Sequence, residues 1–157
     1  MPAPLLFVLS GLTQYVGAAV AVRLFGTLPP TTIAWLRIAI AAVILLGWAR
    51  PWRARLRGRR LATAALFGVV LAGMNVSFYI AIAHLPLGTA VAVEFLGPVS
   101  VAAVTGRGWR DRASIGVALV GVVLLAGVSL GMGPGARVGL LAILAAAVLW
   151  AGYIVLG

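Results

Sequence analysis

A single carboxylate, Glu94, stands in the apolar stretch that runs from residue 86 to residue 98. Placing a carboxylate inside membrane hydrocarbon costs roughly 2.5–3.5 kcal/mol on insertion scales, so such residues are usually functional. Pro98 follows four residues later, and its ring removes the helical hydrogen bond that the carbonyl of residue 94 would otherwise accept. We therefore expect a helix break at Gly97 and Pro98. An acid beside a freed carbonyl is how an interrupted membrane helix forms a polar site at depth.

The composition is that of an integral membrane protein. Of the 157 residues, 64% are hydrophobic and 9% are charged, and the mean hydropathy is +1.19. Soluble domains are about half apolar and about a quarter charged. The chain has no cysteine, one histidine (His84) and one acid besides Glu94, namely Asp111. These residues provide neither a metal-ligand cluster nor the paired acid and base of a hydrolase, so we expect no metal, no cofactor and no enzymatic activity.

Six apolar segments are each long enough to cross a bilayer as a helix, which takes about 17–25 residues. We therefore predict an all-α membrane protein, a polytopic helical bundle. The expected helices are residues 3–22, 31–49, 61–84, 87–105, 113–131 and 138–157.

The positive charge is concentrated between these segments. All twelve basic residues are arginines, the formal net charge is +10, and most of the arginines lie in the short loops 50–60 and 107–112. Loops of this kind remain in the cytoplasm under the positive-inside rule, which also makes the amino terminus cytoplasmic. We expect the lipid bilayer to be the partner rather than nucleic acid, because nothing in the sequence resembles a groove-reading element.

Polar residues on four of the expected helices lie at a similar depth. Counted from the outer end at about 1.5 Å per residue, Gln14, Arg37, Asn75 and Glu94 are roughly 9–13 Å inside. Polar groups in lipid need partners and so tend to converge. Tyr79 shares a helix face with Asn75, four residues earlier. We predict that these five residues form a substrate- and proton-binding site.

Structural roles are equally open for these residues. Glu94 could form a static ion pair with Arg37 that fixes the helix register, and Arg37 could instead anchor its helix near the outer surface. Asn75 and Gln14 could make hydrogen bonds between helices, and Tyr79 could be a packing residue.

The segment Phe78–Pro98 resembles helices 3 and 4 of EamA-domain transporters in the drug/metabolite transporter superfamily, and most of all the branch with the bacterial threonine/homoserine exporter. The stretch Trp35–Arg37 is similar to the arginine-bearing part of that family's second helix. The closing stretch Trp150–Gly157 resembles the opening of the family's second repeat.

The resemblance implies a ten-helix inner-membrane protein that consists of two inverted five-helix repeats. Such proteins export amino acids such as threonine and homoserine, or related small metabolites, in exchange for protons. Residues 1–132 would form the first repeat, and residues 138–157 would form the first helix of a truncated second repeat. We expect the chain to be a fragment of such a transporter, which a homodimer or the missing second repeat would complete.

In this hypothesis, Glu94 exchanges a proton for the ammonium of an amino-acid substrate, and Asn75, Tyr79 and Gln14 orient the polar ends of that substrate. One alternative is a non-transporting membrane subunit or truncated remnant, in which the polar residues at this depth only specify how the helices pack. Another is an exporter of cationic drugs, with Glu94 as the counter-charge. The scarcity of aromatic residues in segments 61–84 and 87–105 favours small polar substrates.

Overall fold

The computed structural model describes residues 3–50, 58–106, 108–130 and 133–156 of the chain. In these ranges all regular secondary structure is α-helical, which confirms the predicted all-α membrane bundle. The helices are α1 (Ala3–Leu24), α2 (Pro30–Ala49), α3 (Arg59–Ile82), α4 (Leu87–Glu94), α5 (Leu96–Thr105), α6 (Trp109–Leu130) and α7 (Pro134–Leu156).

The expected helix boundaries differ from the observed ones in two ways. The segment 87–105, expected as one helix, is divided into α4 and α5. Helices α6 and α7 begin four residues earlier than expected. Helix α6 includes arginines, whose long side chains allow a helix to continue past the apolar core towards the interface. Helix α7 begins at Pro134, a residue that suits a first helical turn because its missing N–H would have no partner there.

Four helical segments are long and apolar enough to cross a membrane. They are α2, α3, the interrupted span Leu87–Thr105 formed by α4 and α5, and most of α7 (Gly135–Leu156). Among the described residues, α1 and α6 contribute shorter apolar stretches, Val8–Leu24 and Ile115–Leu124. The chain is therefore a multi-pass membrane protein.

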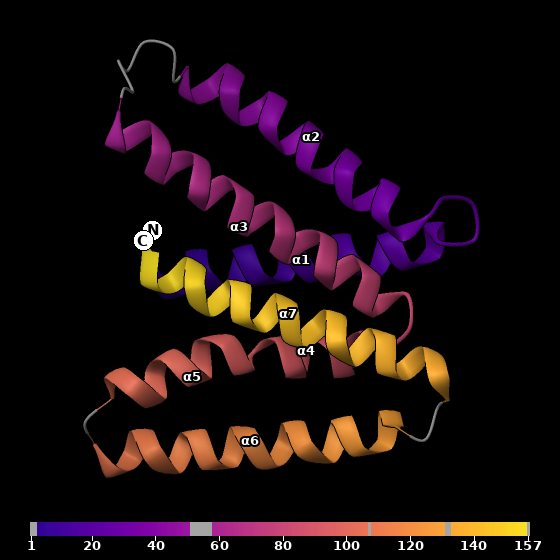
Figure 1. Cartoon of the computed structure of the whole chain (residues 1–157), viewed down its shortest axis with the longest axis vertical. Helices are drawn as coiled ribbons and strands as arrows, with labels where there is room; N and C mark the ends of the chain where they lie inside the picture. The colour runs from indigo at the N-terminus through magenta and orange to yellow at the C-terminus, as the bar shows by residue number, and fades with distance from the viewer. Residues whose placement is uncertain (1–2, 51–57, 107, 131–132, 157) are drawn as a thin grey trace.

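Helix α7 occupies the middle of the bundle (Figure 1). It packs most extensively against α3 and also lies along α4 and α5, while α6 packs on the far side of α4 and α5. Helix α2 packs on α3, and α1 has the sparsest contacts with the other helices. The buried core consists mainly of residues from α3, α4 and α7, with smaller contributions from α1, α2 and α6.

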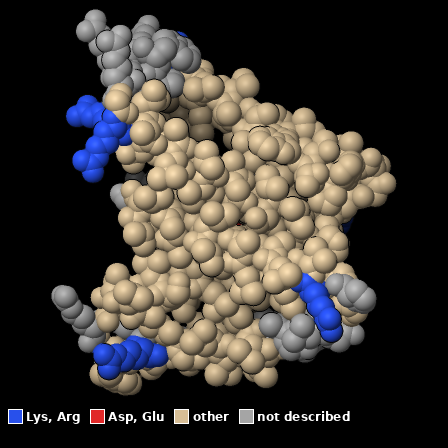
Figure 2. Space-filling view, viewed as in Figure 1, with Lys and Arg blue, Asp and Glu red and all other residues tan. Residues whose placement is uncertain are grey.

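Both chain ends lie at the same end of the bundle (Figure 1). Helix α2 ends there, α3 begins there, α5 ends there and α6 begins there, as six crossings of a membrane would require. Arg50, Arg59, Arg60 and Arg112 are exposed at these helix ends. Figure 2 shows arginines at the margins of the molecule and a broad uncharged surface between them. This distribution matches helices whose middle portions lie in lipid and whose ends reach the interfaces.

The interrupted span packs tightly on α7 through a residue without a side chain. A Cβ atom at Gly97 would collide with the backbone carbonyl oxygen of Ala147 and would lie 3.2 Å from Cβ of Trp150. The rings of Phe95 and Trp150 also contact each other, with centroids 5.3 Å apart. Small residues permit such close helix approach in membranes, where packing supplies much of the association energy.

We expect Gly97→Ala to destabilise the bundle by about 1–3 kcal/mol, because backbone atoms of α7 would have to move. The loss would appear as a lower midpoint of thermal unfolding in detergent, followed by circular dichroism. Gly116→Ala on α6 is the matched control, since nothing lies within 4 Å of a Cβ atom there. Equal midpoints for the two variants would contradict the close packing of α5 on α7.

Candidate functional site

The fourth span is interrupted next to its carboxylate. Helix α4 ends at Glu94, and α5 begins at Leu96. Phe95 keeps near-helical angles (φ −62°, ψ −13°), and its N–H donates to the carbonyl of Val91 at 3.1 Å. We expected the break at Gly97 and Pro98, but both lie in the first turn of α5. The difference follows from the chemistry of proline, which is tolerated in a first turn and removes the donor for the carbonyl four residues earlier.

Glu94 is enclosed within the bundle. Its side chain is 1% exposed, and its Oε2 atom has no hydrogen-bond partner among the described residues. Ala90 and Val93, which precede it on α4, are also buried. A buried polar atom without a partner is rare in native proteins and calls for a specific explanation.

Arg37 is paired with a tyrosine and not with Glu94. Its Nη1 donates a hydrogen bond of 2.9 Å to Oη of Tyr79, and its guanidinium carbon lies 5.9 Å from the centre of the Tyr79 ring. Tyr79 is 1% exposed and packs edge-on against Phe25 and Phe78. Tyr79 thus combines packing with a polar contact. The static ion pair between Glu94 and Arg37, one of the roles left open by the sequence, is not formed.

A cavity of about 380 Å³ lies between α1, α2 and α3. Three of the five predicted site residues line it, one from each helix: Gln14, Arg37 and Asn75. The remainder of its lining is apolar and comes from Ile38, Ala41, Ala42, Leu45, Gly68, Leu71, Ala72 and Met74. The convergence of three polar side chains on a mostly apolar cavity is typical of small-molecule sites.

A second cavity, of about 470 Å³, adjoins this one along α1. Gln14 and Arg37 line both cavities, and Leu9, Ser10 and Thr13 complete the second. The Thr13 hydroxyl donates to the carbonyl of Leu9 in its own helix. Arg37 therefore lines two neighbouring cavities.

The structure divides the predicted polar layer into two parts. Gln14, Arg37 and Asn75 share the cavity, and Tyr79 is joined to it through Arg37. Glu94 does not line the cavity. Asn75 donates through Nδ2 to the carbonyl of Leu71 in its own helix, so this amide nitrogen does not bridge two helices.

Sequence reasoning missed the apolar walls of the cavity. Ala41 and Leu45 lie one and two turns after Arg37, and Gly68 and Ala72 precede Asn75 at the same helical spacing. Small residues on the same helix face as a polar residue are the signal that would have identified these walls, because they leave space between helices.

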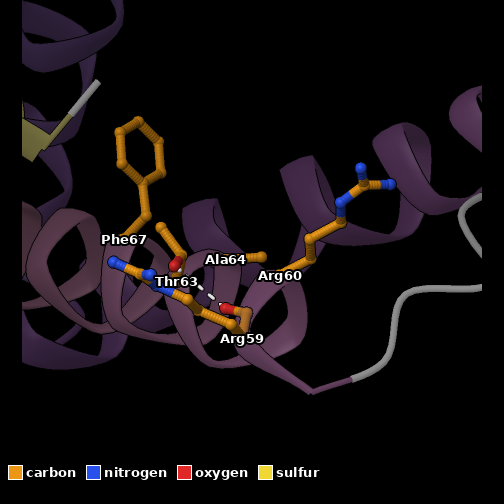
Figure 3. Close-up of a pocket in the computed structure, with 5 residues that line it drawn as sticks. All are labelled: Arg59, Arg60, Thr63, Ala64 and Phe67. Carbon is orange, nitrogen blue, oxygen red and sulfur yellow. Dashed lines mark hydrogen bonds between the residues drawn. The ribbon is translucent and has the colours of Figure 1, made fainter.

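A larger cavity, of about 760 Å³, lies at the start of α3. Its described lining residues all come from α3, so polar side chains of several helices do not converge on it. Its lining includes Arg59, Arg60, Thr63 and Phe67, and the two arginine side chains extend in opposite directions (Figure 3). The Thr63 hydroxyl donates to the carbonyl of Arg59 within the helix. Elsewhere in the described ranges, no three His, Cys, Asp or Glu side chains come together as metal ligands would.

Comparison with curated proteins finds relatives named as exporters. The chain is 34% identical over 141 residues to the threonine/homoserine exporter RhtA of Salmonella typhimurium strain LT2, which covers 90% of this chain and 48% of that protein. It is 37% identical over 109 residues to the protein of the same name from Escherichia coli strain K12, covering 69% of this chain and 37% of that protein.

The chain spans about half the length of the curated relatives it matches. No family model matches the chain, and no solved structure matches it. By sequence it is similar to proteins named as exporters.

Proposed function

We propose that the chain forms part or all of an inner-membrane secondary transporter that exports small amino acids such as threonine and homoserine in exchange for protons. The observation that carries the proposal is the buried carboxyl group of Glu94, whose Oε2 atom has no partner, at the interruption between α4 and α5. An ionisable residue held inside a membrane bundle without a structural partner is typical of proton and ion pathways. The names of the relatives supply the substrate class.

In the proposed mechanism, Glu94 takes up a proton from one side of the membrane and exchanges it for the ammonium of the substrate. The structure has Glu94 enclosed, so the exchange requires a conformation in which water reaches the carboxyl group. The interruption at Phe95 supplies a point at which α4 and α5 can move relative to each other, because broken membrane helices commonly line transporter sites.

The cavity favours small polar substrates over large drugs. Its volume of about 380 Å³ is near the lower end of the range of about 300–1,000 Å³ found for small-molecule sites. No aromatic side chain is among its described lining residues, whereas a cationic-drug site would be expected to offer aromatic walls.

The position of the cavity suits loading from the cytoplasm. Its lining extends along α2 to Leu45, about 6 Å along the helix axis from the arginine-rich end at Ala49. We propose that this end is cytoplasmic, as is the amino terminus, because arginine-rich loops remain on that side.

We also propose that transport requires a second set of helices, from another copy of the chain or from a second repeat. The curated relatives are about twice as long as the region that the chain matches. In addition, α1, which contributes Gln14 to the cavity, has the sparsest packing of the helices. Further helices packed against α1 would close the cavity off from lipid.

We expect Glu94→Gln to reduce proton-driven threonine flux by about tenfold or more, because an amide can neither release a proton nor pair with an ammonium. The measurement is the flux of labelled threonine in proteoliposomes that contain the chain and carry an imposed pH gradient. Undiminished flux in the variant would contradict the role of Glu94.

Asp111→Asn is the matched control, since it removes the only other acidic residue of the chain. It is expected to transport as the unaltered protein does. If the unaltered chain shows no flux, completion by a second copy of the chain is refuted, which leaves a second repeat as the missing part or the alternative of a non-transporting subunit.

Orientation can be tested with single cysteines, because the chain has none of its own. Leu28→Cys lies in the connection between α1 and α2, and Gly108→Cys lies just before α6; both positions are exposed. A membrane-impermeant maleimide applied to intact cells should label the cysteine at position 28 and not the one at position 108. The opposite labelling would show that the arginine-rich end faces outward.

A further inference from the structure

The charge of Arg37 is not neutralised by any carboxylate in the described part of the chain. The guanidinium group has five N–H donors, and the hydrogen bond found for it goes to the neutral hydroxyl of Tyr79. Glu94, which the sequence suggested as an ion-pair partner of Arg37, lies elsewhere in the bundle. Its Oε2 atom has no hydrogen-bond partner among the described residues. A cation at membrane depth is costly without a counter-charge, so an anion that reaches Arg37 would be bound favourably.

The surroundings of Arg37 can receive such an anion. Arg37 is half-buried and lines both cavities, together with Gln14, and Asn75 on α3 lines the cavity of about 380 Å³. The Gln14 side chain offers two amide donors. A guanidinium fork matches a carboxylate with two parallel hydrogen bonds, whereas the apolar walls offer no competing acceptor side chain.

We propose that Arg37, assisted by Gln14, binds the carboxylate of an α-amino-acid substrate. This inference rests on the proposed export function, but it concerns the opposite end of the substrate from the one assigned to Glu94. Because Glu94 is enclosed and Arg37 is accessible, Arg37 is the charged group that a substrate in the cavity meets first. The ligand class is therefore a small zwitterion that carries a free carboxylate.

Tyr79 acts in this arrangement as a positioning residue. Its hydroxyl accepts the hydrogen bond from Nη1 of Arg37, and its ring is fixed by Phe25 and Phe78. Holding one edge of the guanidinium group leaves the other donors available and reduces the motion that must be lost when a ligand binds. Removal of the hydroxyl should weaken carboxylate binding without removing the charge.

The test compares two ligands that differ only at the carboxyl end. Equilibrium binding of L-threonine and of L-threoninamide to the purified full chain in lipid nanodiscs is measured at a pH where both amino groups are protonated. The unaltered chain should prefer threonine by about tenfold or more, since charge-assisted bidentate hydrogen bonds would be lost with the amide. Arg37→Gln should abolish this preference and leave threoninamide binding nearly unchanged.

Three variants complete the design. Arg23→Gln removes an arginine at an exposed position in the last turn of α1 and should keep the full preference. Arg37→Lys keeps the charge without the planar fork and should keep part of the preference. Tyr79→Phe should show a smaller loss than Arg37→Gln. Each variant is compared with the unaltered chain by gel filtration and thermal unfolding, so that misfolding is recognised.

The outcomes separate this inference from the export proposal. Equal binding of the two ligands by the unaltered chain, or an undiminished preference in both Arg37 variants, overturns the carboxylate site and leaves the role of Glu94 in flux unaffected. A preference that depends on Arg37 in a chain without flux supports the carboxylate site and refutes transport by this chain alone. If neither ligand binds the unaltered chain, the carboxylate site is refuted.

Discussion

One constraint governs the rest of the structure: the carboxyl group of Glu94 is enclosed in a helical bundle that is itself surrounded by lipid. Glu94 is 1% exposed on α4, a helix that packs against α3, α6 and α7, and the adjoining α5 packs on α7 through the bare backbone of Gly97 against Ala147. Pro98 then leaves the carbonyl of Glu94 without its helical donor. The five-residue segment from Glu94 to Pro98 therefore supplies the polar group, weakens the helix next to it and packs against the central helix α7.

Arg37 and Glu94 are not joined in a structural ion pair. A buried pair of opposite charges can be neutral in its effect on stability, and it offers little to a ligand once both partners are satisfied. Here Arg37 bonds to the hydroxyl of Tyr79, and Oε2 of Glu94 has no partner among the described residues. In this conformation Arg37 reaches the cavity and Glu94 does not.

The sequence was sufficient to predict the helices and the convergence of three polar residues. Apolar length predicted the spans, since twenty or so apolar residues have few other stable conformations in lipid. Depth along the helices predicted that Gln14, Arg37 and Asn75 would meet, and they line one cavity. The rotation of each helix about its own axis was harder to predict from the sequence. Its residues are apolar on nearly every side, so no one face is marked as the buried one. For this reason the separation of Glu94 from the cavity and the bond between Arg37 and Tyr79 required the structure.

The central position of α7 has a consequence for biogenesis. Helix α7 contacts α3, α4 and α5, yet it is synthesised after all of them. While the ribosome is still producing the chain, the groove that will hold α7 stands empty and Gly97 has no neighbour from that helix. The contacts of Gly97 and Phe95 with α7 can form only after the nascent chain has passed Trp150, so the earlier helices stay in the bilayer without them until then.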